Sequence, residues 1–322
     1  MKKIATLTSG GDAPGMNAAV RAIIRGSKHF GIEVTAVRHG YKGLIDGSFE
    51  NLQHTDVSGI IQRGGTILKS ARSDEFRTEE GRKRAGDQLR KEGVEALIVI
   101  GGDGTFRGAT LLSEEQGINT IGIPATIDND LIGTDETIGY DTALNTAMEA
   151  IDKIRDTADA HERLFFIEVM GRDAGFIALE TGIASGAEMI VLPEYLTSLS
   201  EIRESLNKVL KARKRSSLVV IAEGDQTGGA VKISEALKKD FEQYDMKVAI
   251  LGHVQRGGNP TARDRVLATR LGFEAVQAID QGKSDVMVGI INNNVTFTPL
   301  KDTFGKIKAI NNDLVALAKI LR

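Results

Sequence analysis

The chain has 322 residues, of which 41% are hydrophobic and 26% are charged, and this is typical of a globular protein with room for two domains. Its formal net charge of −3 gives no general attraction to nucleic acid or to an acidic membrane surface, so any anion site has to be local. The absence of cysteine excludes disulfides, thiolate metal sites and a cysteine nucleophile.

Short apolar runs that end in glycine or polar residues recur along the chain. They occupy residues 4–7, 96–100, 121–124, 164–170, 218–222 and 248–251. Nearly continuous apolar runs of this length indicate strands that are buried on both faces, as in parallel sheets. Between them, one helix is predicted after Thr78, and another over residues 200–210, where Ser198 and Glu201 have capping-box spacing. This alternation predicts an α/β fold with a site between two α/β domains.

The chain starts directly with a strand-like segment and lacks the longer apolar region of a signal peptide. No apolar stretch approaches the ~20 residues that span a bilayer. We therefore expect the protein to be cytoplasmic.

Two glycine-rich turns follow predicted strands, at residues 101–105 and 8–17. Glycine lets the backbone approach phosphate oxygens, and a following helix N-terminus supplies donors and positive potential. Asp103 could hold Mg²⁺ through oxygen. Each turn alone fits an ordinary strand-to-helix connection equally well. The dinucleotide fingerprint G-x-G-x-x-G fails because Arg107 occupies its third glycine position, and the Walker A pattern is missing.

Residues 126–130 place two carboxylates, Asp128 and Asp130, in a polar loop after a strand. In an extended segment this spacing projects both side chains to the same side. One carboxylate could face a metal-bound phosphate while the other accepts a proton from an attacking hydroxyl. A turn with caps explains the same pair without any chemistry.

Four cationic residues, Arg163, Arg172, His253 and Arg256, lie beside glycines or at the ends of predicted strands. Guanidinium groups match phosphate bidentately, and an imidazole can add a further donor. These residues could also be structural or surface groups, but their positions favour an anion site.

Five segments together, Thr8–Asn17, Gly101–Thr105, Thr126–Asp130, Met170–Arg172 and Gly252–Gly258, give the chain a resemblance to the ATP-dependent 6-phosphofructokinase family over essentially its whole length. The resemblance implies the phosphofructokinase fold, with two three-layer α/β domains, mostly parallel sheets and an active site in the cleft between them. It also implies transfer of the γ-phosphoryl group of Mg-ATP to the 1-hydroxyl of fructose 6-phosphate, in glycolysis.

The resemblance further implies domain limits and an assembly. The ATP-binding domain would comprise residues 1–138 and 252–300, and the fructose 6-phosphate-binding domain residues 139–251 and 301–322. The assembly would be a homotetramer, with ADP or phosphoenolpyruvate as possible allosteric effectors.

The resemblance assigns the individual residues as follows. The ATP-binding positions are Gly11, Tyr41, Arg72, Ser73, Gly102, Asp103, Gly104, Thr105 and Gly108, with Asp103 on the metal. The fructose 6-phosphate positions are Thr126, Asp128, Asp130, Arg163, Met170, Gly171, Arg172, Glu223, Lys247, His253 and Arg256. The catalytic positions are Gly11, Arg72, Thr126, Asp128, Asp130 and Arg172, and the effector positions are Arg21, Arg25, Arg155, Glu188 and Lys214.

Within this set, Asp128 would be the general base toward the sugar hydroxyl, and Asp130 would help to orient substrate and metal. Arg72 would stabilise the transferring group, and Arg163 would reach the sugar phosphate from a neighbouring subunit. The chain departs from the family at Lys247, where arginine is usual, and at Ala125, where glycine is usual. At the effector site, His54, Gly59, Ala212 and Ser216 also differ from the usual residues.

Three alternatives remain. A pyrophosphate-dependent phosphofructokinase usually has aspartate at the position of Gly104 and lysine at that of Ala125, so this chain favours ATP. NAD and lipid kinases share the 101–105 motif but lack the segments 126–130 and 252–258 in this arrangement. A nucleotide sensor without enzymatic activity would not need the three carboxylates at 103, 128 and 130 together.

Overall fold

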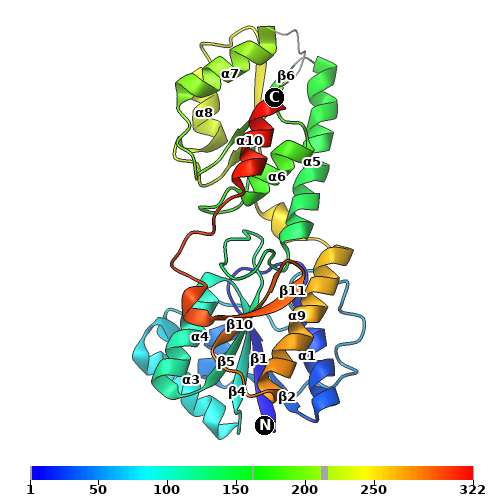
Figure 1. The fold of residues 1–322 in the computed structure, drawn as a ribbon, viewed down its shortest axis with the longest axis vertical. Helices are drawn as coiled ribbons and strands as arrows, with labels where there is room; N and C mark the ends of the chain where they lie inside the picture. Colours follow the sequence, from blue (N-terminus) through cyan, green and yellow to red (C-terminus); the bar gives the residue numbers. More distant parts are fainter. Residues whose placement is uncertain (1, 162, 212–216, 322) are drawn as a thin grey trace. The chain divides into compact units, whose positions relative to one another are not determined.

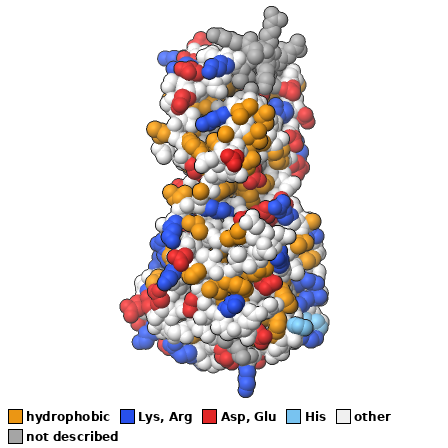
Figure 2. Space-filling model, viewed as in Figure 1, with side chains coloured by type: hydrophobic (Ala, Val, Ile, Leu, Met, Phe, Trp, Pro, Cys, Tyr) orange, Lys and Arg blue, Asp and Glu red, His pale blue; other side chains and the backbone are white. Residues whose placement is uncertain are grey.

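The computed structural model describes residues 2–161, 163–211 and 217–321. Within these ranges, no helix has both the length and the apolar content needed to cross a membrane. On the face drawn in Figure 2, Lys and Arg side chains are interspersed with Asp and Glu, as the near-balanced net charge leads one to expect.

The chain forms two compact units, which are drawn with their elements in Figure 1. Unit 1 comprises Met1–Thr142 and Arg256–Lys308, and unit 2 comprises Ala143–Gln255 and Ala309–Arg322. Each unit has its own sheet with helices packed on it, and most strands run parallel, which confirms the predicted α/β class. The assignment of one domain to ATP and the other to fructose 6-phosphate, with a site between them, stays a prediction.

Unit 1 contains a seven-stranded sheet in the order β11-β10-β5-β4-β1-β2-β3. Its strands are β1 (Lys3–Thr8), β2 (Glu33–Val37), β3 (Phe49–Glu50), β4 (Ala96–Gly101), β5 (Asn119–Pro124), β10 (Val286–Ile291) and β11 (Asn294–Pro299). Its helices are α1 (Met16–Phe30), α2 (Gly40–Asp46), α3 (Glu79–Lys91), α4 (Asp103–Gln116) and α9 (Ala262–Asp280), with 3₁₀ turns η1 (Glu75–Arg77) and η3 (Leu300–Asp302). Only the edge strands β3 and β11 are antiparallel to their neighbours.

Unit 1 has three layers (Figure 1). Helices α1 and α9 pack together on one face of the sheet, and α2, α3 and α4 pack on the other. Alternate residues of β1 and β4, such as Leu7 and Val99, join Leu89 and Phe106 in the core under α3 and α4. The intervening residues face α1 and α9, so these central strands are buried on both sides, as a parallel sheet requires.

Unit 2 contains a four-stranded parallel sheet in the order β7-β8-β6-β9. Its strands are β6 (Arg163–Val169), β7 (Met189–Val191), β8 (Ser217–Ala222) and β9 (Asp245–Ile250). Its helices are α6 (Phe176–Ala184), α7 (Leu199–Lys211), α8 (Gly229–Leu237) and α10 (Asn312–Ile320); α5 (Tyr140–His161) enters it from unit 1, and the 3₁₀ turn η2 (Gly252–Arg256) leaves it.

The six predicted strands correspond to β1, β4, β5, β6, β8 and β9, and both predicted helices are confirmed. Thr78 caps α3 by accepting a hydrogen bond of 3.1 Å from the Gly81 N–H. Ser198 and Glu201 form the predicted capping box, in which the Glu201 N–H donates to Ser198 Oγ and the Ser198 N–H donates to Glu201 Oε2.

The prediction that every one of these strands is buried on both faces is wrong for β9. Its side chains Val248 and Ile250 are 37% and 57% exposed. The reason is that β9 is an edge strand, which pairs only with β6 in the described sheet.

A buried carboxylate in unit 1 caps the start of α5. Asp264 on α9 accepts hydrogen bonds from the Gly139 N–H (2.7 Å), the Thr142 N–H (2.8 Å) and the Thr142 hydroxyl (2.5 Å). Burial raises the pKa of Asp264 from its ordinary 3.8 to about 6; the three hydrogen bonds oppose this rise, and the nearby Asp141 carboxylate adds to it. Asp264 therefore joins two helices at the point where α5 begins.

Asp264→Asn should destabilise the protein by about 1–3 kcal/mol, because an amide offers a single acceptor oxygen to three buried donors. The loss should depend on pH. Because the pKa of Asp264 is higher in the folded protein (about 6) than its ordinary value of 3.8, protonation of Asp264 stabilises the fold. This contribution is complete below pH 3.8 and is lost as the pH rises through about 6. The difference in thermal unfolding between the parent and the variant should therefore widen as the pH falls from 6 to 4.

The exposed Asp313 in the first turn of α10 supplies the matched control. Asp313→Asn should change the unfolding temperature little, because surface substitutions usually have small effects on stability. Equal behaviour of the two variants would show that Asp264 is not an energetically important cap.

Candidate functional site

The turns after β1 and β4 flank the point where the strand order of the unit 1 sheet reverses. From β1 the sheet continues to β2 on one side and to β4 and β5 on the other. Open parallel sheets bind ligands in the crevice outside the carboxyl ends of their strands at such a point. The two glycine-rich turns, residues 8–17 and 101–105, therefore occupy the expected position of a ligand site.

The N-terminus of α4 is free of side-chain capping. Gly102 is the N-cap residue, and as a glycine it has no side chain to cap the turn that begins at Asp103. The hydroxyl oxygen of Thr105 is buried and has no hydrogen-bond partner within the described part of the chain. Backbone N–H groups at a helix start together with a buried hydroxyl form a set of donors that suits phosphate oxygens.

Two glycines at this helix start have different reasons to lack a side chain. A Cβ atom at Gly101 would overlap the Thr105 side chain and the Ser9 carbonyl oxygen, so glycine is required there for packing. A Cβ atom at Gly104 would meet nothing within 4 Å, and Gly104 is exposed. Packing within the chain therefore does not require glycine at 104, and the space beside it is open to a ligand.

An aromatic pair packs against α4. Tyr41 and Phe76 stack with ring centroids 3.9 Å apart, and a Cβ atom at Gly108 would come within 2.9 Å of the Tyr41 ring. The Tyr41 hydroxyl donates a 2.5 Å hydrogen bond to the Thr105 carbonyl, and burial raises its pKa far above the ordinary value. Ser73 accepts a hydrogen bond from the Phe76 N–H. Of the residues assigned to ATP, Tyr41, Ser73 and Gly108 thus contribute to the support of the helix.

The loop 126–130 joins the turn after β4. The Ala125 N–H donates to the Gly101 carbonyl (3.0 Å), and Thr126 Oγ1 accepts from the Asp128 N–H (3.2 Å). Asp128 is 2% exposed, and Asp130 is half-buried. A buried carboxylate, Asp128, therefore lies three residues after Ala125, which contacts the turn that starts α4.

The argument that Asp128 and Asp130 project to the same side of an extended segment is wrong. Asn129, between them, has a left-handed backbone conformation with φ of 52°, and residues 127–128 form a turn. The period of two applies only to extended backbone, so it does not determine the directions of these carboxylates.

Arg256 supplies a cation to the turn after β1. Its Nη1 donates a 3.5 Å hydrogen bond to the Asp12 carbonyl, and a Cβ atom at Gly11 would lie 2.7 Å from the same nitrogen. Arg72 is exposed. The structure thus brings Arg256, which was assigned to the sugar phosphate, beside Gly11, which was assigned to ATP and catalysis.

In unit 2, two side chains hold the turns at the strand ends together. Glu223 accepts hydrogen bonds from the N–H groups of Gly171 (3.3 Å) and Arg172 (2.8 Å). Gln255 is fully buried; its Oε1 accepts from the Met170 N–H and its Nε2 donates to the Gly252 carbonyl. The predicted residues Met170, Gly171, Arg172 and Glu223 therefore lie together in unit 2.

Gln255 was missed as a site residue, although it lies between the predicted His253 and Arg256. His253 is exposed on η2. Glutamine has no characteristic role in phosphate binding, so only its contact across 85 positions with Met170 reveals its function.

Arg163 and Lys247, on the neighbouring strands β6 and β9, share one carboxylate. Arg163 Nε donates to Asp245 Oδ2 at 2.8 Å, and Lys247 Nζ lies 2.7 Å from Asp245 Oδ1. Lys247 first, and then Arg163, hold the pKa of the exposed Asp245 below its ordinary value. The structure therefore brings these two predicted cations together and adds Asp245, which the sequence analysis missed.

The predicted effector residues belong to both units. On α1 of unit 1, Arg25 donates to Ser58 Oγ (3.3 Å), while burial and then the neighbouring Arg25 lower the pKa of Arg21. In unit 2, Arg155 donates to the Ser185 carbonyl (2.5 Å), and the buried Glu188 accepts from the Leu218 N–H (2.7 Å). Lys214 lies outside the described residues, and the effector site stays a prediction.

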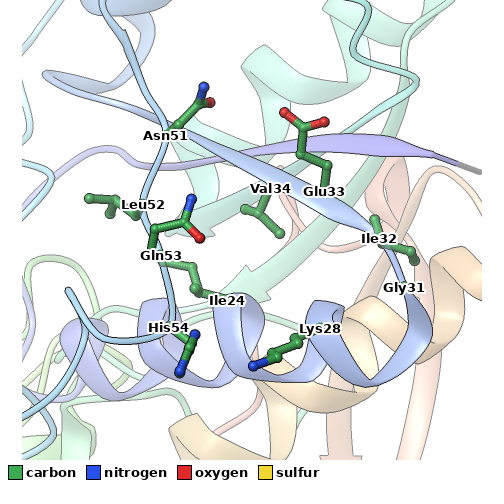
Figure 3. A pocket seen from close by; sticks show the side chains of 10 residues that line it. All are labelled: Ile24, Lys28, Gly31, Ile32, Glu33, Val34, Asn51, Leu52, Gln53 and His54. Carbon is green, nitrogen blue, oxygen red and sulfur yellow. The ribbon is translucent and has the colours of Figure 1, made fainter.

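A cavity of about 490 Å³ in unit 1 lies away from all of these turns (Figure 3). It lies between α1, the start of β2 and the segment 51–54, and its lining includes Lys28, Glu33 and His54. None of the residues predicted to bind ATP or fructose 6-phosphate lines it. Its lining mixes apolar side chains such as Ile24 and Val34 with polar ones such as Asn51 and Gln53, a mixture that is not typical of a phosphate site.

Comparisons with known proteins identify the family. The phosphofructokinase family model matches residues 3–279. The chain is 54% identical to the ATP-dependent 6-phosphofructokinase 1 of Thermus thermophilus, covering 100% of this chain and 99% of the relative. It is 51% identical to the ATP-dependent 6-phosphofructokinase 2 of Bacteroides thetaiotaomicron, covering 100% and 98%.

Among solved structures, the phosphofructokinase of Saccharomyces cerevisiae has a TM-score of 0.87 and 38% identity, and it covers 99% of this chain. The present chain spans only 46% of the yeast chain. The pyrophosphate-dependent phosphofructokinase of Marinobacter aquaeolei has a TM-score of 0.85, 23% identity and coverages of 97% and 86%, and it shows the fold alone. The family match and the full-length relatives show that the chain belongs to the phosphofructokinase family.

Proposed function

We infer that this chain is a kinase that transfers the γ-phosphoryl group of ATP to the 1-hydroxyl of fructose 6-phosphate, giving fructose 1,6-bisphosphate and ADP in glycolysis. The observation that carries this inference is the uncapped start of α4, with open space at Gly104, joined through Gly101 to the loop of Asp128. The names of the full-length relatives, all ATP-dependent 6-phosphofructokinases, support the same reaction.

On the nucleotide side, the first N–H groups of α4, the Thr105 hydroxyl and the Gly11 turn would surround the phosphates. Asp103, the first residue of α4, would hold Mg²⁺. In nucleotide sites Mg²⁺ is bound by one or two carboxylates together with the phosphates, so a single carboxylate fits, although the described residues contain no cluster of three or more potential ligands. When bound, the metal would neutralise charge that develops on the phosphoryl oxygens.

On the acceptor side, Asp128 would take the proton of the sugar 1-hydroxyl as that oxygen attacks the γ-phosphorus. Asp130 and Thr126 would orient the substrate, and Arg72 and Arg172 would stabilise the transferring group. Proton acceptance by a positioned carboxylate suits phosphoryl transfer, where the protein contributes mainly by positioning and electrostatics.

Cationic side chains of unit 2, together with Arg256 of unit 1, would bind the 6-phosphate of the sugar. Arg163 and Lys247 already lie within hydrogen-bond distance of one carboxylate, which orders both cations before the anion arrives. In the homotetramer that we propose, Arg163 would serve the site of a neighbouring subunit, and His253 and Arg256 would serve the site of their own.

The second candidate is a pyrophosphate-dependent enzyme, because solved structures of that kind share the fold at 22% and 23% identity. Gly104 favours ATP. An aspartate at this position, in the first turn of α4, would place a carboxylate beside the nucleotide phosphates, whereas the open space at Gly104 leaves room for them.

Gly104→Asp should impair the use of ATP by about 10²-fold in kcat/KM, because a like charge beside the phosphates costs several kcal/mol. The KM for fructose 6-phosphate should change little. Folding should be preserved, because a side chain at 104 meets nothing within 4 Å and aspartate is favourable in the first turn of a helix. Steady-state kinetics with ATP and with pyrophosphate as donor would measure the effect.

Gly104→Ala and Gly104→Asn are the matched controls, since they add a methyl group and an amide of nearly the same size without charge. Both should retain most of the ATP activity. If the aspartate variant matches the asparagine variant, the charge at position 104 does not select the donor.

Asp128→Asn should lower kcat by about 10²–10⁴, the usual contribution of a general base, while both KM values change much less. Asparagine keeps the shape of the side chain but cannot accept the proton. The control is Asp87→Asn, which removes an exposed carboxylate that pairs with Arg90 on α3. A kcat for Asp128→Asn within about threefold of the control, far short of this range, would exclude Asp128 as the base and make Asp130 the next candidate.

A further inference from the structure

The residue between the two carboxylates of the 126–130 loop is fastened to the last residue of unit 1. We propose that Asn129 and Lys308 form a clip that positions Asp128 for proton transfer, so that both are positioning residues for the reaction. The proposal rests on the role of Asp128 in the proposed function. Neither residue was singled out by the sequence analysis as part of the site.

Asn129 is 4% exposed and uses both ends of its side-chain amide. Its Oδ1 accepts hydrogen bonds from the Thr137 N–H (3.1 Å) and from Lys308 Nζ (3.0 Å), and its Nδ2 donates to the Asp135 carbonyl (3.1 Å). Its left-handed φ of 52° is tolerated by asparagine better than by most residues. The side chain thus fixes a turn that lies directly between Asp128 and Asp130.

Thr137, which contacts Asn129, also contacts the start of the 126–130 loop. The hydroxyl of Thr137, which is fully buried, donates a 2.5 Å hydrogen bond to the Thr126 carbonyl. Thr126 Oγ1 in turn accepts from the Asp128 N–H (3.2 Å). The backbone on both sides of Asp128 is therefore held against residues 135–137, and Asn129 is the link to Lys308.

Lys308 adds a charge to this arrangement. Its ammonium donates to Asn129 Oδ1 and to the Asp135 carbonyl, each at 3.0 Å. Hydrogen bonds from an ionised donor are about twice as strong as neutral ones. The half-buried Lys308 thus clamps the asparagine and the backbone of the opposite segment together.

Removal of the ammonium would leave neither acceptor without a donor. Asn129 Oδ1 would keep the Thr137 N–H, and the Asp135 carbonyl would keep Asn129 Nδ2. The fold should therefore survive the loss of Lys308, whereas the exact placement of the loop should not. Because misplacement of a reacting group by about 1 Å can cost 10²-fold in rate, the effect should appear in kcat.

The test compares Lys308→Met with Lys306→Met in the full-length protein. Lys306 lies two positions earlier and makes an exposed 3.4 Å ion pair with Asp302, so it reports the loss of a lysine without the clip. Lys308→Met should lower kcat by at least about tenfold, with KM values for ATP and fructose 6-phosphate within about threefold and an unfolding temperature close to that of the control. Lys308→Arg should restore a substantial part of kcat.

Asn129→Gly supplies a second, independent variant. Glycine adopts the left-handed conformation without cost, so this change removes only the amide contacts. It should also lower kcat, and the double variant with Lys308→Met should lose less than the product of the two single losses, because both act through one contact.

Two outcomes separate the clip from the proposed function. If Asp128→Asn is impaired while Lys308→Met keeps the kcat of Lys306→Met, the clip is overturned and the role of Asp128 stands. If Asp128→Asn retains the parent kcat, the loop is not the catalytic loop, and the clip fails with it. A fall in the unfolding temperature of Lys308→Met with unchanged kcat would show a structural role only and would also overturn the clip.

Discussion

The close approach of three strand ends around Gly101 is the constraint on which the candidate site depends. The Ser9 N–H donates to the carbonyl of Ile100, and the Ala125 N–H donates to that of Gly101, so the turns after β1, β4 and β5 meet at one place. A Cβ atom at Gly101 would overlap Ser9 and Thr105. A side chain there would push the start of α4 away from the turn after β1, and the two glycine-rich turns would lose their common support.

The strands at the centres of the two sheets could be predicted from the sequence because burial on both faces leaves a continuous apolar run. The runs 4–7 and 96–100 mark β1 and β4, which lie in the middle of the seven-stranded sheet. Edge strands carry a weaker pattern. β3 has two residues, and β11 has only exposed and partly buried positions, so neither stands out in the sequence.

The residues that would touch phosphate in our proposal were assigned from five short motifs, which together resemble the phosphofructokinase family. The residues that hold those motifs in place could not be assigned in this way. Asn129 contacts Lys308 across 179 positions, and Gln255 contacts Met170 across 85. An asparagine or glutamine whose partner lies far away in the sequence leaves no local pattern, and only the folded chain shows what it supports.

The two units would hold phosphate by different means, and this explains where the specificity of the enzyme resides. In our proposal, the backbone N–H groups and one hydroxyl at the start of α4 in unit 1 would bind any phosphate chain. The choice between ATP and pyrophosphate would then depend on the absence of a side chain at Gly104. In unit 2 the groups are the long side chains of Arg163 and Lys247, ordered in advance by Asp245. Selectivity between ATP and pyrophosphate could therefore change through one residue at an open position. Selectivity for the sugar phosphate would depend on several charges that act together. The Lys247 of this chain, where the resemblance leads one to expect arginine, would keep the charge at that position and lose the bidentate fork of a guanidinium.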